Sequence, residues 1–300
     1  MIQQLQARHG IPNVVRFDEG RGDLIRATIT TPLASAEVYL HGAHVTHYQP
    51  AGQKPVLWLS DKSMYEAGKP IRGGVPICFP WFGPRAGDAA SPAHGFARIS
   101  EWEVESVLRD AAGIVEITLS LRANEQTRGI WAHAFTARYR VRVGSTLELS
   151  LSIANDDAVA FIFEEAMHTY LVVGDVRNAT ISGLEGATYI DKTDGLKRKP
   201  QGSDPVTISA ETDRVYVNTE ATCVLDDPIL GRRIEIAKRN SDTTVVWNPW
   251  IAKSKAMADF GDDEWPGVLC IETCNTGEQQ ITLQPGQTHE MVAVIHALQR

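Results

Sequence analysis

The sequence has little cysteine, and what it has shows no metal or redox spacing. The four cysteines are Cys78, Cys223, Cys270 and Cys274, and no two of them form a Cys-x-x-Cys motif. Because no second ligand pair accompanies Cys270 and Cys274, we interpret these two thiols as core residues. Reduced thiols are typical of a cytoplasmic protein, and we predict that location.

Long apolar runs and an excess of positive charge are also absent. No apolar stretch reaches the ~18 residues of a membrane span, and residues 1–10 lack the apolar centre of a signal peptide. Lys and Arg number 29 against 37 Asp and Glu, which gives a net charge of −8. This balance argues against nucleic acid and against an anionic membrane as partners, although a local cluster of arginines remains compatible with it.

Nucleotide, nucleophile and metal motifs are missing as well. The glycine-rich segment 72–76 lacks a Walker lysine, and neither Gly-x-Gly-x-x-Gly nor Gly-x-Ser-x-Gly occurs. His41, His44 and His47 lie three residues apart. On a strand such residues point to opposite faces, so their imidazoles cannot converge on one metal ion, and we expect no metal site.

What the sequence does contain is the period-two alternation of half-buried strands. Residues 135–143 alternate apolar with polar side chains, residues 144–146 supply turn chemistry, and residues 147–153 resume the alternation. Shorter stretches of strand character are residues 28–30, 38–40, 115–121 and 292–295. Alternation of this kind indicates antiparallel sheets with one buried and one wet face.

These patterns predict an all-β protein built as one antiparallel β-sandwich. We expect a single domain over residues 1–300, with residues 1–25 as an irregular N-terminal segment. Residues 83–92 and 197–204 are predicted loops, and residues 61–65 are predicted to form one helical turn that Gly68 and Pro70 end. No long amphipathic helices alternate with the strands, which excludes a parallel α/β sheet.

A few polar residues stand in strongly apolar or aromatic surroundings. His94, His168 and Glu272 are the candidates, and Glu272 directly follows the run Val-Leu-Cys-Ile. A carboxylate is costly to bury there unless it is hydrogen-bonded or functional, but strand alternation alone could also place it on a wet face. Arg72 and Arg98 flank aromatic loops, a combination that suits a sugar ring with an anionic substituent.

Several motifs, taken in order, resemble those of the hexose-phosphate mutarotases, a branch of the aldose 1-epimerase superfamily. The motifs lie at residues 39–46, 70–76, 79–83, 94–98, 166–170, 212–216, 246–250 and 270–272. The resemblance runs from about residue 30 to the C-terminus. It implies the galactose-mutarotase-like β-supersandwich, which agrees with the strand pattern.

The resemblance also implies a reaction, the interconversion of the α and β anomers of a hexose 6-phosphate such as glucose 6-phosphate. In this reaction a base takes the proton of the anomeric hydroxyl, an acid protonates the ring oxygen, and the opened sugar recloses on its other face. By resemblance Glu272 is the base and His168 the acid. Chemistry of this kind needs no redox cofactor and no metal.

Further roles follow from the same resemblance. Arg72 and Arg98 match substrate-binding arginines, which implies a phosphate clamp, and Asp213 matches a substrate-binding aspartate. His94 matches a histidine expected to bond the sugar and assist His168. Many relatives carry glutamine where this chain has Ala93, so we expect one hydrogen bond to the substrate to be missing.

Three alternatives remain open from the sequence. The chain could be an aldose 1-epimerase on unphosphorylated sugar, or a non-catalytic protein that binds a sugar phosphate. A glycoside hydrolase would need a pair of carboxylates, for which Asp213 and Glu272 are the candidates, but His168 would then have no role. We expect a small-molecule sugar phosphate as the partner and a monomer or weak dimer as the assembly.

Overall fold

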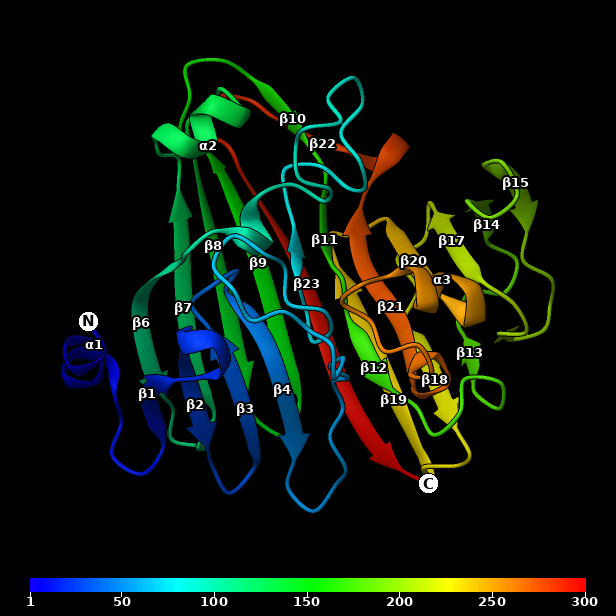
Figure 1. Cartoon of the computed structure of the whole chain (residues 1–300), viewed down its shortest axis with the longest axis horizontal. Coiled ribbons are helices and arrows are strands. Elements are labelled where there is room, and N and C mark those ends of the chain that lie inside the picture. Colours follow the sequence, from blue (N-terminus) through cyan, green and yellow to red (C-terminus); the bar gives the residue numbers. More distant parts are fainter.

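The computed structural model describes all 300 residues, and antiparallel strands dominate it (Figure 1). The largest sheet has nine strands in the order β16-β13-β18-β19-β23-β9-β8-β7-β6. In chain order these are β6 (Glu103–Arg109), β7 (Val115–Arg122), β8 (Phe135–Val143), β9 (Leu147–Asn155), β13 (Thr180–Ser182), β16 (Val206–Thr207), β18 (Cys223–Asp227), β19 (Arg232–Arg239) and β23 (Thr288–Gln299). The predicted all-β class is confirmed.

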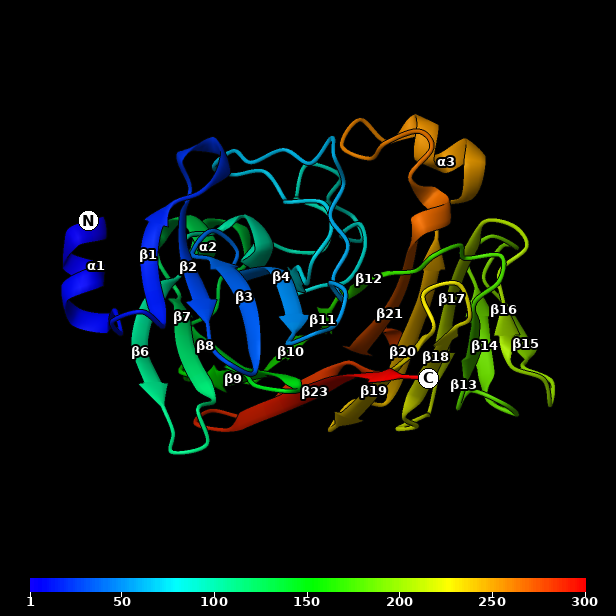
Figure 2. The ribbon, with the colours of Figure 1, turned by 90° about the horizontal axis from the view of Figure 1, so that it is seen from below.

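Two further sheets cover one side of this layer. In Figure 2 both lie above the nine-stranded sheet, the four-stranded one over β6–β9 and the eight-stranded one toward the other end. The four-stranded sheet contains β1 (Val15–Glu19), β2 (Ile25–Thr30), β3 (Ala34–Tyr39) and β4 (His44–Pro50). The eight-stranded sheet contains β5 (Ile77–Cys78), β11 (Glu165–Met167), β12 (Tyr170–Val172), β14 (Thr188–Asp191), β15 (Lys197–Pro200), β17 (Thr212–Val217), β20 (Thr243–Asn248) and β21 (Val268–Asn275).

The remaining elements are short. A two-stranded ribbon pairs β10 (Phe161–Phe163) with β22 (Ile281–Leu283). The helices are α1 (Ile2–His9), α2 (Glu125–Ile130) and α3 (Trp250–Ala256), with 3₁₀ turns at Arg21–Asp23, Ala97–Ile99, Trp265–Gly267 and Gly277–Gln279. None of the helices is both long and apolar enough to cross a membrane. The main hydrophobic cluster holds 72 buried residues and reaches from Val15 to Ala297, so the sheets share one core.

The alternating segments form strands where the sequence predicts them. β8 and β9 pair across the bend at residues 144–146, and β7 pairs with β8. Along β8 the buried positions include Phe135, Tyr139 and Val141, while Arg138 is exposed. Residues 28–30 fall in β2 and residues 292–295 in β23, and residues 83–92 form the predicted loop.

Three local predictions are wrong. Residues 1–25 are not irregular, because they form α1, β1 and a 3₁₀ turn, and β1 pairs with β2. α1 has no fully buried residue, and only Ile2 and Leu5 pack against the core, so its apolar pattern is too short to predict a helix. Residues 197–200 form the edge strand β15, whose side chains are largely exposed and therefore do not alternate. Residues 61–65 form no helical turn, since the Asp61 amide and the Ser60 hydroxyl donate to the carboxylate of Glu264 instead.

Candidate active site

Strand register gathers one set of side chains on a single face of the eight-stranded sheet. Asp213 on β17 pairs with Trp247 on β20, and Val245 on β20 pairs with Glu272 on β21. Because cross-strand partners project to the same face, and residues two apart on a strand do too, all four side chains share that face. They line a cavity of about 190 Å³. The lining residues are Arg72, Phe82, His94, His168, Lys192, Asp213, Val245, Trp247, Lys253, Met257 and Glu272.

A larger hollow lies elsewhere, between α1 and the first strands. Its volume is about 870 Å³, but apolar, amide and threonine side chains line it and Arg16 is its only ionisable group. It therefore has no group that could move a proton at neutral pH. The smaller cavity on the eight-stranded sheet is the candidate active site.

His168 lies where the pairing partner of β21 changes from β11 to β12. Its backbone amide donates to the carbonyl of Pro76, and this hydrogen bond holds the segment between β11 and β12 in place. Its Nε2 lies 3.3 Å from Oε1 of Glu272, and the two side chains are 8% and 1% exposed. The ring of Tyr170 stacks on the imidazole at 4.6 Å, nearly parallel. The wet-face alternative for Glu272 is thus wrong, because its carboxyl is buried against a histidine.

Burial shifts the two members of this pair in opposite directions. It raises the pKa of Glu272 well above its ordinary value, and the charge of Asp213 adds to the rise. It lowers the pKa of His168 well below 6.5, with the positive charges of Arg72 and Arg98 as further causes. Both shifts favour a neutral carboxyl beside a neutral imidazole, so a proton on this pair is available for transfer.

Three cations line the cavity. Arg72 binds Asp259 through Nε at 3.2 Å and Nη2 at 3.1 Å, and its Nη1 donates to the Tyr170 hydroxyl at 2.9 Å. Nζ of Lys192 lies 3.7 Å from Oδ1 of Asp213 and 4.8 Å from the ring centre of Phe82.

Lys253, the third cation, projects from α3 and binds Glu211 at 2.9 Å. The sequence predicts neither lysine as a site residue, because Lys192 follows a strand end and Lys253 lies on a short helix, at spacings typical of no binding motif. The site is therefore more cationic than its predicted residues indicate.

Arg98 is the predicted site residue that the fold keeps out of the lining. It is 8% exposed, and its Nη2 donates to the carbonyl of Ala93 at 2.8 Å. Its charge still reaches the site, where it lowers the pKa of His94 after the effect of burial. The backbone of Ala93 therefore holds this arginine, while direct contact of Arg98 with a substrate stays a prediction.

His94 lines the cavity in a strained backbone conformation. Its φ of +66° is unusual for a residue with a side chain. The backbone amide of Gly83 donates to Nδ1 of the ring at 3.3 Å, and Sγ of Cys78 lies 3.4 Å from the same nitrogen. The ring of His94 is 5.9 Å from that of His168, centre to centre. Five of the six predicted site residues thus meet in one cavity.

Comparison with known proteins shows the family of the chain. The family model described as aldose 1-epimerase matches residues 26–296. The chain belongs to the aldose 1-epimerase family. Proteins of Salmonella typhimurium and Escherichia coli, both named provisionally as glucose-6-phosphate 1-epimerases, are each 38% identical to it. The match to the Salmonella protein covers 87% of this chain and 86% of that protein. The match to the Escherichia coli protein covers 89% of this chain and 88% of that protein.

Solved structures share the fold over the whole chain. The provisionally named mutarotase YeaD of Salmonella typhimurium superposes with a TM-score of 0.91 at 34% identity, covering 100% of both chains. HI1317 superposes with a TM-score of 0.80 at 24% identity, covering 96% of this chain and 97% of that one, which shows the fold alone. As an aldose 1-epimerase family member, the protein is an enzyme that interconverts sugar anomers, and the galactose-mutarotase-like fold is confirmed.

Proposed function

We propose that the protein interconverts the α and β anomers of a hexose 6-phosphate, with glucose 6-phosphate as the substrate to test first. The observation that carries the proposal is one cavity that combines the His168–Glu272 pair with three cationic side chains. The pair supplies the acid and the base, and the cations supply a counter-charge for a phosphate group. The names of the bacterial relatives support the same substrate.

The proposed reaction needs one proton shared by His168 and Glu272, both for ring opening and for ring closure. The proton that Glu272 holds in the free site first passes to His168. The resulting carboxylate takes the proton of the anomeric hydroxyl while the imidazolium of His168 protonates the ring oxygen, which opens the ring. After rotation about C1–C2, the protonated carboxyl returns its proton to the new anomeric oxygen and His168 recovers its own. The pair ends as it began, so the mechanism needs no other acid or base.

A phosphate near the cations would also assist the acid. The charge of Arg72 is one cause of the lowered pKa of His168. A bound dianion offsets that positive field, so His168 would hold its proton more readily with substrate than without it. In this way phosphate binding would prime the acid for ring opening.

Phosphate recognition is assigned to Arg72 and Lys192, with Lys253 nearby and Arg98 acting through its field. Asp213 is assigned to the sugar hydroxyls, since its pKa is raised by burial and a hydroxyl donor would suit its carboxylate. The guanidinium of Arg72 is already oriented by Asp259 and Tyr170, which lowers the cost of fixing it on a ligand.

The test compares fresh α-glucose 6-phosphate with fresh α-glucose, with anomer exchange followed by NMR. We expect the phosphorylated sugar to be accelerated more. Arg72→Ala should raise KM for the phosphorylated sugar about tenfold or more, since a hydrogen bond to a charged group is lost, and change KM for glucose far less. Arg26→Ala is the matched control, because Arg26 also forms ion pairs, with Asp18 and Glu37, but lies on β2. Equal effects of Arg72→Ala on both sugars would favour an epimerase of unphosphorylated aldoses.

A further inference from the structure

Two donors converge on Nδ1 of His94, and neither belongs to the acid–base pair. The first is the backbone amide of Gly83, 3.3 Å away, which can only donate. The second is the thiol of Cys78 at 3.4 Å. Burial raises the pKa of that thiol to about 12, so it keeps its proton at neutral pH. A nitrogen that accepts in this way carries no proton of its own.

The opposite ring nitrogen of His94 has the complementary property. Its Nε2 has no partner within the protein, and it is not among the buried atoms that lack one. Burial, together with the charges of Arg98, Lys192 and Arg72, lowers the pKa of His94 well below 6.5, so the ring is neutral. A neutral ring with an accepting Nδ1 carries its single proton on Nε2.

We propose that Cys78 is a positioning residue that, with the Gly83 amide, fixes His94 as the Nε2–H tautomer. His94 then presents a permanent neutral donor to a sugar oxygen, while proton transfer is left to His168 and Glu272. The inference rests on the proposed function in one respect, namely that the oxygen which accepts from Nε2 belongs to a sugar. The tautomer itself is a property of the free protein.

Two features of the fold hold Cys78 and Gly83 in place beside the ring of His94. β5 ends at Cys78, which pairs with Ala166 of β11, so the thiol is fixed on the sheet that carries the site. The amide of His94 donates to the carbonyl of Gly83 at 2.7 Å, while the Gly83 amide donates back to the His94 ring. The strained φ of His94 keeps its ring within reach of both donors.

The first experiment reads the tautomer directly, without substrate. In protein labelled with ¹⁵N-histidine, long-range proton–nitrogen correlations distinguish the protonated from the unprotonated ring nitrogen. We expect the His94 ring to show a protonated Nε2 and an unprotonated Nδ1 from pH 6 to 8. A proton on Nδ1 would overturn the proposal. This result does not depend on turnover, so it separates failure of this inference from failure of the proposed function.

The second experiment tests Cys78 against a matched buried cysteine. Cys274 on β21 pairs with the same residue, Ala166, from the other side, and makes no hydrogen bond to His94. Cys78→Ala should move the ¹⁵N resonance of Nδ1 toward that of a free acceptor, and lower kcat/KM about threefold to tenfold for one lost hydrogen bond. Cys274→Ala should leave the resonance in place. The same resonance in both variants would remove Cys78 from the mechanism.

The third experiment tests which ring nitrogen of His94 donates to the substrate. A glutamine amide reaches about as far as Nε2, whereas an asparagine amide reaches only as far as Nδ1. His94→Gln should therefore keep more activity than His94→Asn, with an unchanged pH profile because the native ring does not titrate in the working range. Equal or reversed activities of the two variants would contradict a donor at Nε2.

Discussion

A histidine–glutamate pair lies on each face of the paired strands β11 and β21. On the cavity face, Nε2 of His168 lies 3.3 Å from Oε1 of Glu272. On the other face, Nε2 of His289, from β23, lies 3.0 Å from Oε1 of Glu165. In both pairs the second carboxylate oxygen has no partner. Residue types and the distance between the two side chains are thus nearly the same, yet only the His168–Glu272 pair lines the candidate active site.

The electrostatic surroundings separate the two pairs. Burial lowers the pKa of His168, and neighbouring cations lower it further. For His289, burial acts in the same direction, but the hydrogen bond and charge of Glu165 outweigh it and raise the pKa. The side chain of His289 is also 18% exposed, so its charge is partly solvated. The neighbouring charges therefore shift the pKa values of the two histidines in opposite directions, which favours a neutral His168 and a protonated His289.

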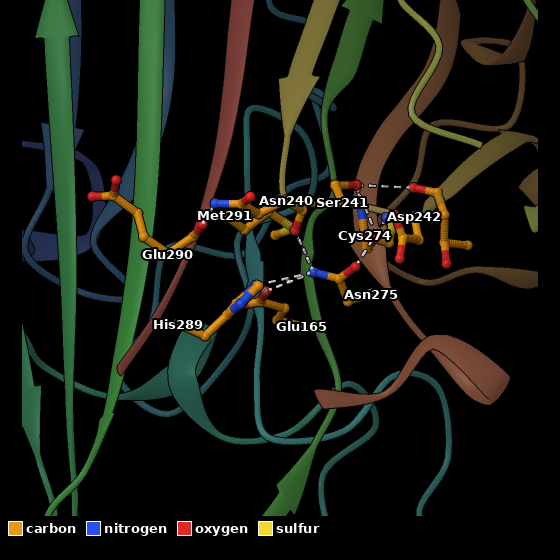
Figure 3. Close-up of polar contacts among 10 residues, drawn as sticks. Glu165, Asn240, Ser241, Asp242, Cys274, Asn275, His289, Glu290 and Met291 are labelled. Atoms are coloured by element: carbon orange, nitrogen blue, oxygen red, sulfur yellow. Dashed lines mark hydrogen bonds and ion pairs between the residues drawn. The ribbon is translucent and has the colours of Figure 1, made fainter. Parts of the chain in front are cut away.

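A second difference is what holds each carboxylate. Figure 3 shows the side chains of Glu165, Asn275 and His289 converging between the two large sheets. Nδ2 of Asn275 donates to Oε1 of Glu165 at 2.9 Å, and its Oδ1 accepts from the amide of Asp242 at 3.0 Å. Glu165 and Asn275 are direct cross-strand partners. This network joins the eight-stranded sheet to β23 of the nine-stranded sheet, so the Glu165–His289 pair stabilises the packing of the two sheets.

The largest expected effect is on turnover. Glu272→Gln keeps the shape of the side chain but removes the base that we propose, so we expect anomer exchange to slow about 10²–10⁴-fold. Glu165→Gln, the same substitution on the other face, should change it less than about threefold, because Glu165 does not line the cavity. Exchange rates from NMR of equilibrated anomers measure both. Similar losses in the two variants would contradict the division between the faces.

The next largest effect is on stability, and here we expect the substitution of Glu165 to have the larger effect. Glu165→Ala leaves Asn275 and His289 without their shared acceptor, so we expect about 3 kcal/mol lower free energy of unfolding. Glu272→Gln should lower the free energy of unfolding little, or even raise it, because it removes a desolvated carboxyl whose second oxygen has no partner. Urea midpoints at constant m-value measure the difference. If Glu272→Gln were the more destabilising change, His168 and Glu272 would have to be counted as part of the structural framework.

Sequence patterns predict the regular half-buried strands and fail where a strand is buried or exposed on both faces. β8 alternates because one face is wet, and its bounds could be predicted to within a residue or two. Every residue of β21 is buried, so nothing in its pattern told which face Glu272 occupies. The edge strand β15 fails for the opposite reason, since its side chains are mostly exposed.

The site could be predicted only in part, for a related reason. Motifs gave His94, His168 and Glu272, whose surroundings in the sequence are distinctive. Lys192 reaches the cavity because β14 pairs with β17 in a register that brings it beside Asp213. Lys253 reaches it through the placement of α3. Such positions follow from tertiary packing, which no local pattern contains.

The smallest effect is on the pH dependence of stability, where the two histidines should have opposite signs. The folded protein holds the His289 proton above the ordinary pKa of 6.5, so this residue's contribution is complete below pH 6.5 and is lost as pH rises through the higher folded value. His168 binds its proton less tightly when folded, so its contribution is lost as pH falls below 6.5. Each slope is at most about 1.4 kcal/mol per pH unit, the value for one proton. His289→Gln should therefore flatten the loss on the alkaline side of the profile, and His168→Gln part of the loss on the acid side. Urea unfolding at intervals of half a pH unit from pH 5 to 9 measures both, and slopes of the same sign would show that the two pairs do not differ in the way their surroundings indicate.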